Sequence, residues 1–180
     1  MHYECACREK TLSQIRDMSK ESKAEDVKAE LGTLASQAKS QQELMSRMVK
    51  LLHDRMLKFN WVGFYMLEDG APSQPPMLVL GAFEGAMTPH TRIPLHQGIC
   101  GAAASTGKTV VVDDVSKDPR YLACSLETKS EIVVPIFVKG KVKGELDIDS
   151  HFLAAFGNEE RELVEYCAGL VGKHLEGAKS

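Results

Sequence analysis

Apolar positions recur at helical spacing in residues 40–57 and again in residues 163–175, whereas between them apolar and polar positions tend to alternate. From Ser40 to Leu57 one stripe predicts a helix, formed by Leu44, Met45, Met48, Leu51, Leu52 and Met56. A last helix is predicted after Asn158, which we expect to act as its cap, with a stripe of Leu163, Val164, Cys167, Leu170, Val171 and Leu175. Residues 24–37 predict a short helix, and residues 1–23 are polar and poorly periodic.

Between these helices the pattern favours strands. They are predicted at residues 61–67, 77–83, 109–112, 131–138 and 141–149. A small-residue helix is predicted over 98–105, and Lys139-Gly140 joins the last two strands as a hairpin. Pro135 predicts a sheet edge or a bulge, and residues 115–130 form a loop without a pattern. This order indicates an α+β domain, with an antiparallel sheet and helices mainly on one face.

The last predicted strand carries an unusual row of acids. Successive strand side chains face opposite sides, so Leu146 and Ile148 point into a core while Glu145, Asp147 and Asp149 point the other way. Carboxylates in a row repel one another. One interpretation is a solvated face. The other is a pocket lined for a cationic ligand, or a carboxyl with a raised pKa that supplies a proton.

Composition is that of an ordinary globular chain. The 180 residues predict one domain, with 43% hydrophobic and 26% charged residues. A net charge of -3 gives no electrostatic basis for binding nucleic acid or acidic membranes. No apolar run approaches the roughly 20 residues of a membrane helix. The N-terminus lacks the apolar segment of a signal peptide, so we expect a cytoplasmic protein.

Five cysteines are candidates for chemistry. Cys100 opens a predicted helix, whose N-terminus favours a thiolate and would lower its pKa. Cys124 lies in a loop, which makes it the better candidate for a reactive thiol. Cys167 falls in a helix stripe and is expected to be an inert core thiol. Cys5 and Cys7 give only a weak zinc signal without a second ligand pair, so no metal site is expected.

Several short motifs then occur in a specific order. They are Asn60–Tyr65, Arg92–Pro94, Gly98–Gly101, Ala123–Cys124, Ser130–Pro135 and Leu146–Ser150. Together they resemble the free methionine-(R)-sulfoxide reductases, which are single GAF domains, from about residue 40 to residue 175. The resemblance implies a GAF-like fold for residues 36–180. It does not cover the first 35 or so residues, whose polar and partly helical pattern predicts an N-terminal arm at residues 1–35.

The resemblance also implies an activity. It is the thiol-dependent reduction of free L-methionine (R)-sulfoxide to methionine, through a cysteine sulfenic acid and a disulfide. Cys124 is similar to the family's attacking nucleophile, and Cys100 to its second redox cysteine. The implied partners are free methionine sulfoxide and a thioredoxin-like reductant. We expect no cofactor, no nucleic acid and no membrane partner, and a homodimer is compatible with the sequence.

The candidate binding residues suit such a substrate. Glu131, Asp147 and Asp149 can pair with the ammonium group of a free amino acid, and one of them could stay protonated as the acid. Trp61 and Tyr65 are four apart on a strand and therefore share a face. Such a pair is usually core packing, but beside carboxylates it can also surround an S-methyl group.

One position departs from the family pattern. His90 stands where the family usually has a cysteine, so the thiol that resolves the sulfenic acid is open among Cys100, Cys5 or Cys7, and an external thiol. The alternative function is a small-molecule-binding GAF sensor without catalysis. A third reading is a scaffold dimer with an inactive site. The acidic pocket argues against a phosphate ligand, which favours the enzyme.

Overall fold

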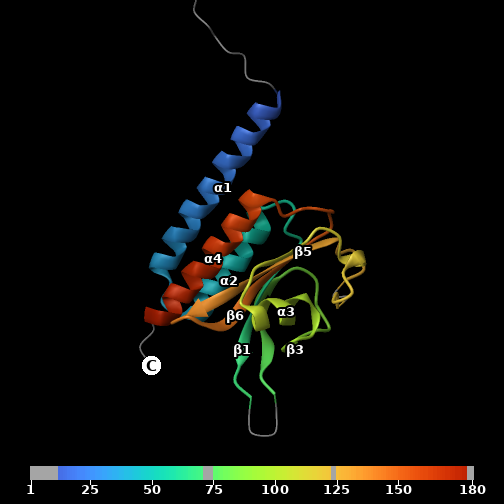
Figure 1. Ribbon diagram of the computed structural model, residues 1–180. Coiled ribbons are helices and arrows are strands. Elements are labelled where there is room, and N and C mark those ends of the chain that lie inside the picture. Colours follow the sequence, from blue (N-terminus) through green and yellow to red (C-terminus); the bar gives the residue numbers. More distant parts are fainter. Residues whose placement is uncertain (1–11, 71–74, 123–124, 178–180) are drawn as a thin grey trace, which may run out of the picture.

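A computed structural model describes residues 12–70, 75–122 and 125–177, with side chains from residue 23 onward. Within these ranges the strands form one antiparallel sheet of order β3-β2-β1-β6-β5-β4 (Figure 1). The strands are β1 (Trp61–Glu68), β2 (Met77–Glu84), β3 (Arg92–Pro94), β4 (Val110–Val112), β5 (Ser130–Val138) and β6 (Lys141–Ser150). The helices are α1 (Leu12–Gln37), α2 (Gln41–Arg55), α3 (Gly98–Thr106) and α4 (Asn158–Gly177), with the 3₁₀ turn η1 (Val115–Lys117).

Helices α1, α2 and α4 cover one face of the sheet, and α3 lies against the other (Figure 1). The apolar stripes predicted from the sequence meet the sheet in one core, which includes Leu44, Met48, Leu52, Leu146, Ile148, Leu163 and Cys167. Ser40 caps α2 by accepting a hydrogen bond from the N–H of Glu43 at 3.2 Å. The predicted α+β class, with helices mainly on one face, is therefore confirmed.

Helix α1 is longer than the predicted segment 24–37, because it already begins at Leu12. Residues 12–23 contain no glycine or proline that would break a helix, although they lack an apolar stripe. Val27, Leu31 and Leu34 are buried in the same core as α2 and α4. The division into an arm and a domain stays a prediction. No helix within the described ranges is long and apolar enough to span a bilayer.

Pro135 lies at a position in β5 where only one neighbouring strand is paired with it. On one side it pairs with Glu145 of β6, but the pairing of β4 with β5 ends at Val133. The proline therefore lies at a local edge, and the register shifts between Ile136 and Phe137. Both features predicted from the proline are present.

Three local details differ from the sequence prediction. Arg92–Pro94 pairs with β2 as a strand too short to show a period. Val115–Lys117 forms a 3₁₀ turn inside the segment expected to be a patternless loop. Asn158 is the first residue of α4 rather than its cap, and the N–H of Gly157 instead donates to the Glu160 carboxylate at 3.0 Å.

Candidate functional site

Strand β6 lies between β1 and β5, and its register arranges the candidate side chains in rows. Asp149 is opposite Trp61 on β1 and Glu131 on β5. In the next row on the same face, Asp147 is opposite Gly63. Residues directly opposite each other in adjacent strands share a face, so the rows lie side by side on the face that α3 covers.

All four carboxylates of this face are buried. The exposed fractions are 0% for Glu145, 2% for Asp147, 4% for Asp149 and 5% for Glu131. The interpretation of a solvated strand face is therefore wrong, because these carboxylates are enclosed under α3. The alternation itself is confirmed, since Leu146 on the same strand belongs to the core under the helices.

The first turn of α3 places Cys100 directly on these acids. Its Sγ lies 3.4 Å from Oδ2 of Asp147 and 4.0 Å from Oε1 of Glu131. Burial raises the pKa of the Cys100 thiol well above its ordinary value, and the charges of Asp147, Glu145 and Glu131 raise it further. The expectation that the helix N-terminus lowers this pKa is wrong, because enclosure and neighbouring acids outweigh the helix dipole.

The pKa values of the carboxyl groups are raised as well. Burial raises the pKa of Asp147 to about 7. It also raises the pKa of Glu131 and Asp149 well above the usual range, and the charge of Asp147 adds to both shifts. Near neutral pH the cluster thus retains protons that exposed carboxyl groups would have lost, which gives it both proton donors and anionic acceptors.

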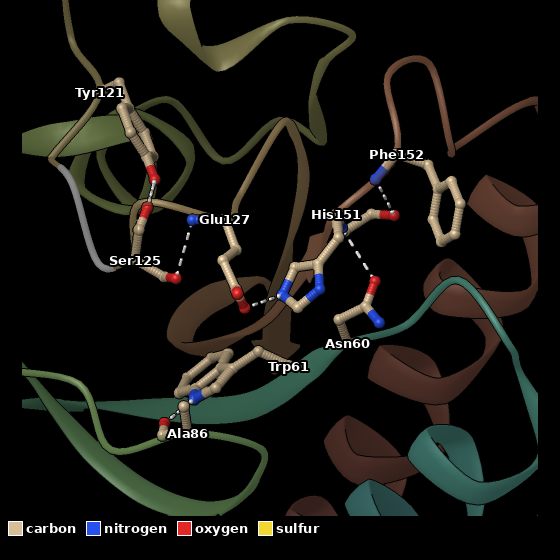
Figure 2. Close-up of polar contacts among 9 residues, drawn as sticks. Asn60, Trp61, Ala86, Tyr121, Ser125, Glu127, His151 and Phe152 are labelled. Carbon is tan, nitrogen blue, oxygen red and sulfur yellow. Dashed lines mark hydrogen bonds and ion pairs between the residues drawn. The ribbon is translucent and has the colours of Figure 1, made fainter.

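A hollow of ≈170 Å³ opens next to Asp149. Its lining includes Trp61, Ala86, Ser125, Glu127, Asp149 and His151. The indole N–H of Trp61 donates to the carbonyl of Ala86 at 3.0 Å, which fixes the ring at the wall (Figure 2). A buried acid and an aromatic face therefore border the same small space.

Sequence reasoning missed three polar residues at this hollow. His151 Nε2 lies 3.6 Å from Oε2 of Glu127, and the His151 N–H donates to Oδ1 of Asn60 at 2.8 Å (Figure 2). Asn60 directly precedes Trp61, and His151 follows Asp149 by two residues. Trp61 and Asp149 are opposite each other in the register. Knowledge of that register would have located both of them, but Glu127 comes from a loop and gave no periodic signal.

Trp61 and Tyr65 lie on one face, with ring centroids 6.2 Å apart, as their spacing predicts. The indole also stacks on Phe83 at 5.9 Å and covers Gly63, where an added Cβ would come within 2.2 Å of the ring. Trp61 reaches the hollow. Tyr65 is completely buried beside it, with its hydroxyl donating to the carbonyl of His90, a half-buried loop residue, at 2.8 Å.

The expected nucleophile, Cys124, lies outside the described residues, as do Cys5 and Cys7. The described residues around Cys124 are at the site. Leu122 packs against the apolar cluster under α3 that contains Cys100. Ser125 lines the hollow. The geometry thus unites Cys100, the acids and Trp61, while the role of Cys124 stays a prediction.

The profile of the GAF domain matches residues 40–175. The chain belongs to the GAF-domain family. This GAF domain is 43% identical over 115 residues to the free methionine-R-sulfoxide reductase of Saccharomyces cerevisiae, covering 63% of this chain and 62% of the yeast protein. It is 38% identical over 112 residues to the Escherichia coli enzyme of the same name, covering 62% and 64%. The aligned segments span less than two thirds of the length of both relatives.

A solved structure extends the similarity to most of this GAF domain. The free methionine-R-sulfoxide reductase of Neisseria meningitidis, in complex with its substrate, superposes with a TM-score of 0.77 at 35% identity. The superposition covers 85% of this chain and 88% of the Neisseria chain. The resemblance inferred from the ordered motifs is therefore confirmed, and so is the fold.

Proposed function

We propose that this protein reduces free L-methionine (R)-sulfoxide to L-methionine, with thiols as the source of electrons. One observation carries the proposal, namely that Asp149 is opposite both Trp61 and Glu131 beside the hollow of ≈170 Å³. That arrangement offers anionic groups and an aromatic surface within one amino-acid-sized space. The similarity to the three reductases supports the same function.

Recognition would use the charge of the free amino acid. The ammonium group would pair with Asp149 and Glu131, with Asp147 in the next row, while the S-methyl group would lie against Trp61. A methionine sulfoxide inside a peptide has a neutral nitrogen that is blocked by chain. The site would therefore select the free amino acid.

The chemical step would begin with the thiolate of Cys124. It would attack the sulfoxide sulfur while a protonated carboxyl, Glu131 or Asp147, gives a proton to the oxygen. The oxygen is then transferred to the cysteine as a sulfenic acid, and methionine leaves with its sulfur reduced by two electrons. The raised pKa values of both carboxyl groups support such a proton donor.

Recycling would consume the sulfenic acid with a second thiol, forming a disulfide and releasing water. Cys100 is the internal candidate within the described residues, and a thioredoxin-like dithiol would then reduce the disulfide. Peptide mass mapping after one equivalent of substrate, without reductant, separates the schemes. A Cys100–Cys124 link supports Cys100, a link from Cys5 or Cys7 supports the N-terminal arm, and Cys124 found only as sulfenic acid supports an external thiol.

The activity test separates an enzyme from a sensor. Purified protein is given dithiothreitol and the free (R)-sulfoxide, the free (S)-sulfoxide or N-acetylmethionine (R)-sulfoxide, and the methionine product is quantified by chromatography. Only the free (R)-epimer should be reduced. A thioredoxin system coupled to NADPH oxidation then tests the reductant. Binding of the substrate in calorimetry without any product would instead show a sensor, and equal rates on the N-acetyl compound would contradict recognition of the ammonium group.

A further inference from the structure

Deep under α3, the thiol of Cys100 lies beside three buried carboxylates. Cys100 contacts Asp147 and Glu131 at 3.4 and 4.0 Å. Among the residues that the structure describes, both carboxylate oxygens of Glu145 and Oδ1 of Asp147 are buried without a hydrogen-bond partner. Buried polar atoms without partners are rare, because each one loses its water without compensation. These orphaned oxygens therefore point to a missing ligand.

The proposed substrate accounts for only one end of this cluster. The hollow borders Asp149, whereas Glu145 lies four residues along β6, about 13 Å away along a strand. Glu145 is opposite Tyr65 and Pro135, neither of which offers it a charged partner. An ammonium group at Asp149 would thus leave Glu145 uncompensated.

The donor atoms near Cys100 have the separations of a metal site. One atom each from Cys100, Glu131 and Asp147 lies within 4.8 Å of the others. In a tetrahedral zinc site, with bonds of about 2.3 Å to sulfur and 2.0 Å to oxygen, sulfur and oxygen are ~3.5 Å apart. The observed 3.4 and 4.0 Å bracket that value, so small side-chain rotations would close the ligands on an ion.

We propose that Cys100, Glu131 and Asp147 bind a thiophilic divalent cation such as Zn²⁺, with Glu145 as the nearby anionic group that completes or supports the site. The thiolate selects Zn²⁺, Co²⁺ or Cd²⁺ over Mg²⁺ and Ca²⁺, which prefer oxygen ligands alone. The ion replaces the thiol proton of Cys100, which is released to solvent, and its charge compensates the buried carboxylates.

Metal binding has a consequence for turnover, and this part rests on the proposed function. An ion held by Glu131 and Asp147 occupies anionic groups that would otherwise face the substrate ammonium. It also removes Cys100 from disulfide exchange, because a coordinated thiolate is not free to attack. Zn²⁺ therefore acts as a reversible inhibitor that a chelator removes.

The test uses Co²⁺ on the reduced, metal-free protein, because a thiolate bound to Co²⁺ gives charge-transfer absorption in the near ultraviolet. Serine replaces Cys5, Cys7 and Cys124 in the starting variant, so that these thiols cannot contribute. One equivalent of Co²⁺ should bind and be displaced by Zn²⁺. Adding Cys100→Ser should abolish the absorption, whereas the matched buried thiol change Cys167→Ser should keep it.

Further measurements protect the test against misfolding. Glu145→Gln should weaken Co²⁺ binding at least tenfold while circular dichroism stays unchanged. In the unaltered chain, Zn²⁺ should slow alkylation of Cys100 but not of Cys167, as mapped by mass spectrometry. No charge-transfer band in the starting variant, or a band that survives Cys100→Ser, overturns the site. Since none of these readouts measures turnover, failure of the metal site and failure of the proposed reductase remain distinguishable.

Discussion

The two faces of the sheet differ in what they bury beside their apolar side chains. On β6, Leu146 and Ile148 enter the apolar core under α1, α2 and α4, while Glu145 and Asp147 enter the site under α3. The first pair is 0% exposed and the second pair 0% and 2%, so burial alone does not distinguish them. Both faces have an apolar cluster, but the face under α3 also buries carboxylates, and three of their oxygens have no hydrogen-bond partner among the described residues.

This contrast indicates a division of work within one strand. A fully buried leucine or isoleucine stabilises the fold by roughly 1.5–3 kcal/mol. A buried carboxylate without a partner costs stability instead. The face under α1, α2 and α4, called here the helix face, thus stabilises the domain. The carboxylates on the face under α3, called the acid face, lower that stability.

The largest contrast is expected between two replacements of cysteine by serine, at Cys124 and at Cys167. Cys124→Ser should reduce sulfoxide turnover to the background rate, since a hydroxyl of much higher pKa cannot attack at neutral pH. Cys167→Ser, in the helix-face core, should keep turnover and lower the free energy of unfolding by about 1–3 kcal/mol, because it buries a hydroxyl. Product formation and urea denaturation measure the two. Normal turnover by the Cys124 variant would refute its assignment as nucleophile.

Truncation on the helix face should be costly for stability. Leu146→Ala leaves a cavity in the core and should lower the free energy of unfolding by about 2–5 kcal/mol. Leu57→Ala, at a side chain 84% exposed, is the matched control and should change it little. Urea denaturation at pH 7 measures both, and equal effects would mean that the core does not carry the stability.

Neutralising one acid should lower kcat/KM for the substrate more than it changes the stability of the fold. Asp149→Asn removes a charged hydrogen bond to the ammonium, worth about 1.5–3 kcal/mol, so kcat/KM should fall roughly 10- to 150-fold. Asp69→Asn, at an exposed acid, should leave kcat/KM unchanged. A loss of the same size on N-acetylmethionine sulfoxide would show that Asp149 does not read the ammonium group.

The acid face should also give the stability a characteristic pH dependence. Burial raises the pKa of Glu145 well above its ordinary value of 4.5. The folded state therefore keeps a proton that the unfolded chain releases, and the free energy of unfolding falls as pH rises from about 4.5 through the folded pKa. Glu145→Met should remove that loss, with a gain of about 1–4 kcal/mol at pH 8 and little at pH 4.5. Urea denaturation across this range measures the gain, and a gain independent of pH would contradict it.

The alternation of side chains between the two faces could be predicted from the sequence, because it follows from the two-residue period within each single strand. The sequence also predicted the hairpin, where Lys139 and Gly140 have φ of 50° and 75°, as such a tight turn requires. It left open whether the acids are buried, and it predicted a lowered pKa for Cys100 where the structure raises it. Both depend on how α3 covers the sheet, and that contact joins segments far apart in the chain.

The absence of a side chain at Gly63 restricts how this sequence can diverge. Because the Trp61 ring occupies the space of a Cβ there, even alanine, the smallest chemical change, would push the ring from its place beside the acids. Replacement of Gly63 is therefore tolerated only when Trp61 changes as well. A library that varies both positions together should recover active pairs which no path of single replacements reaches.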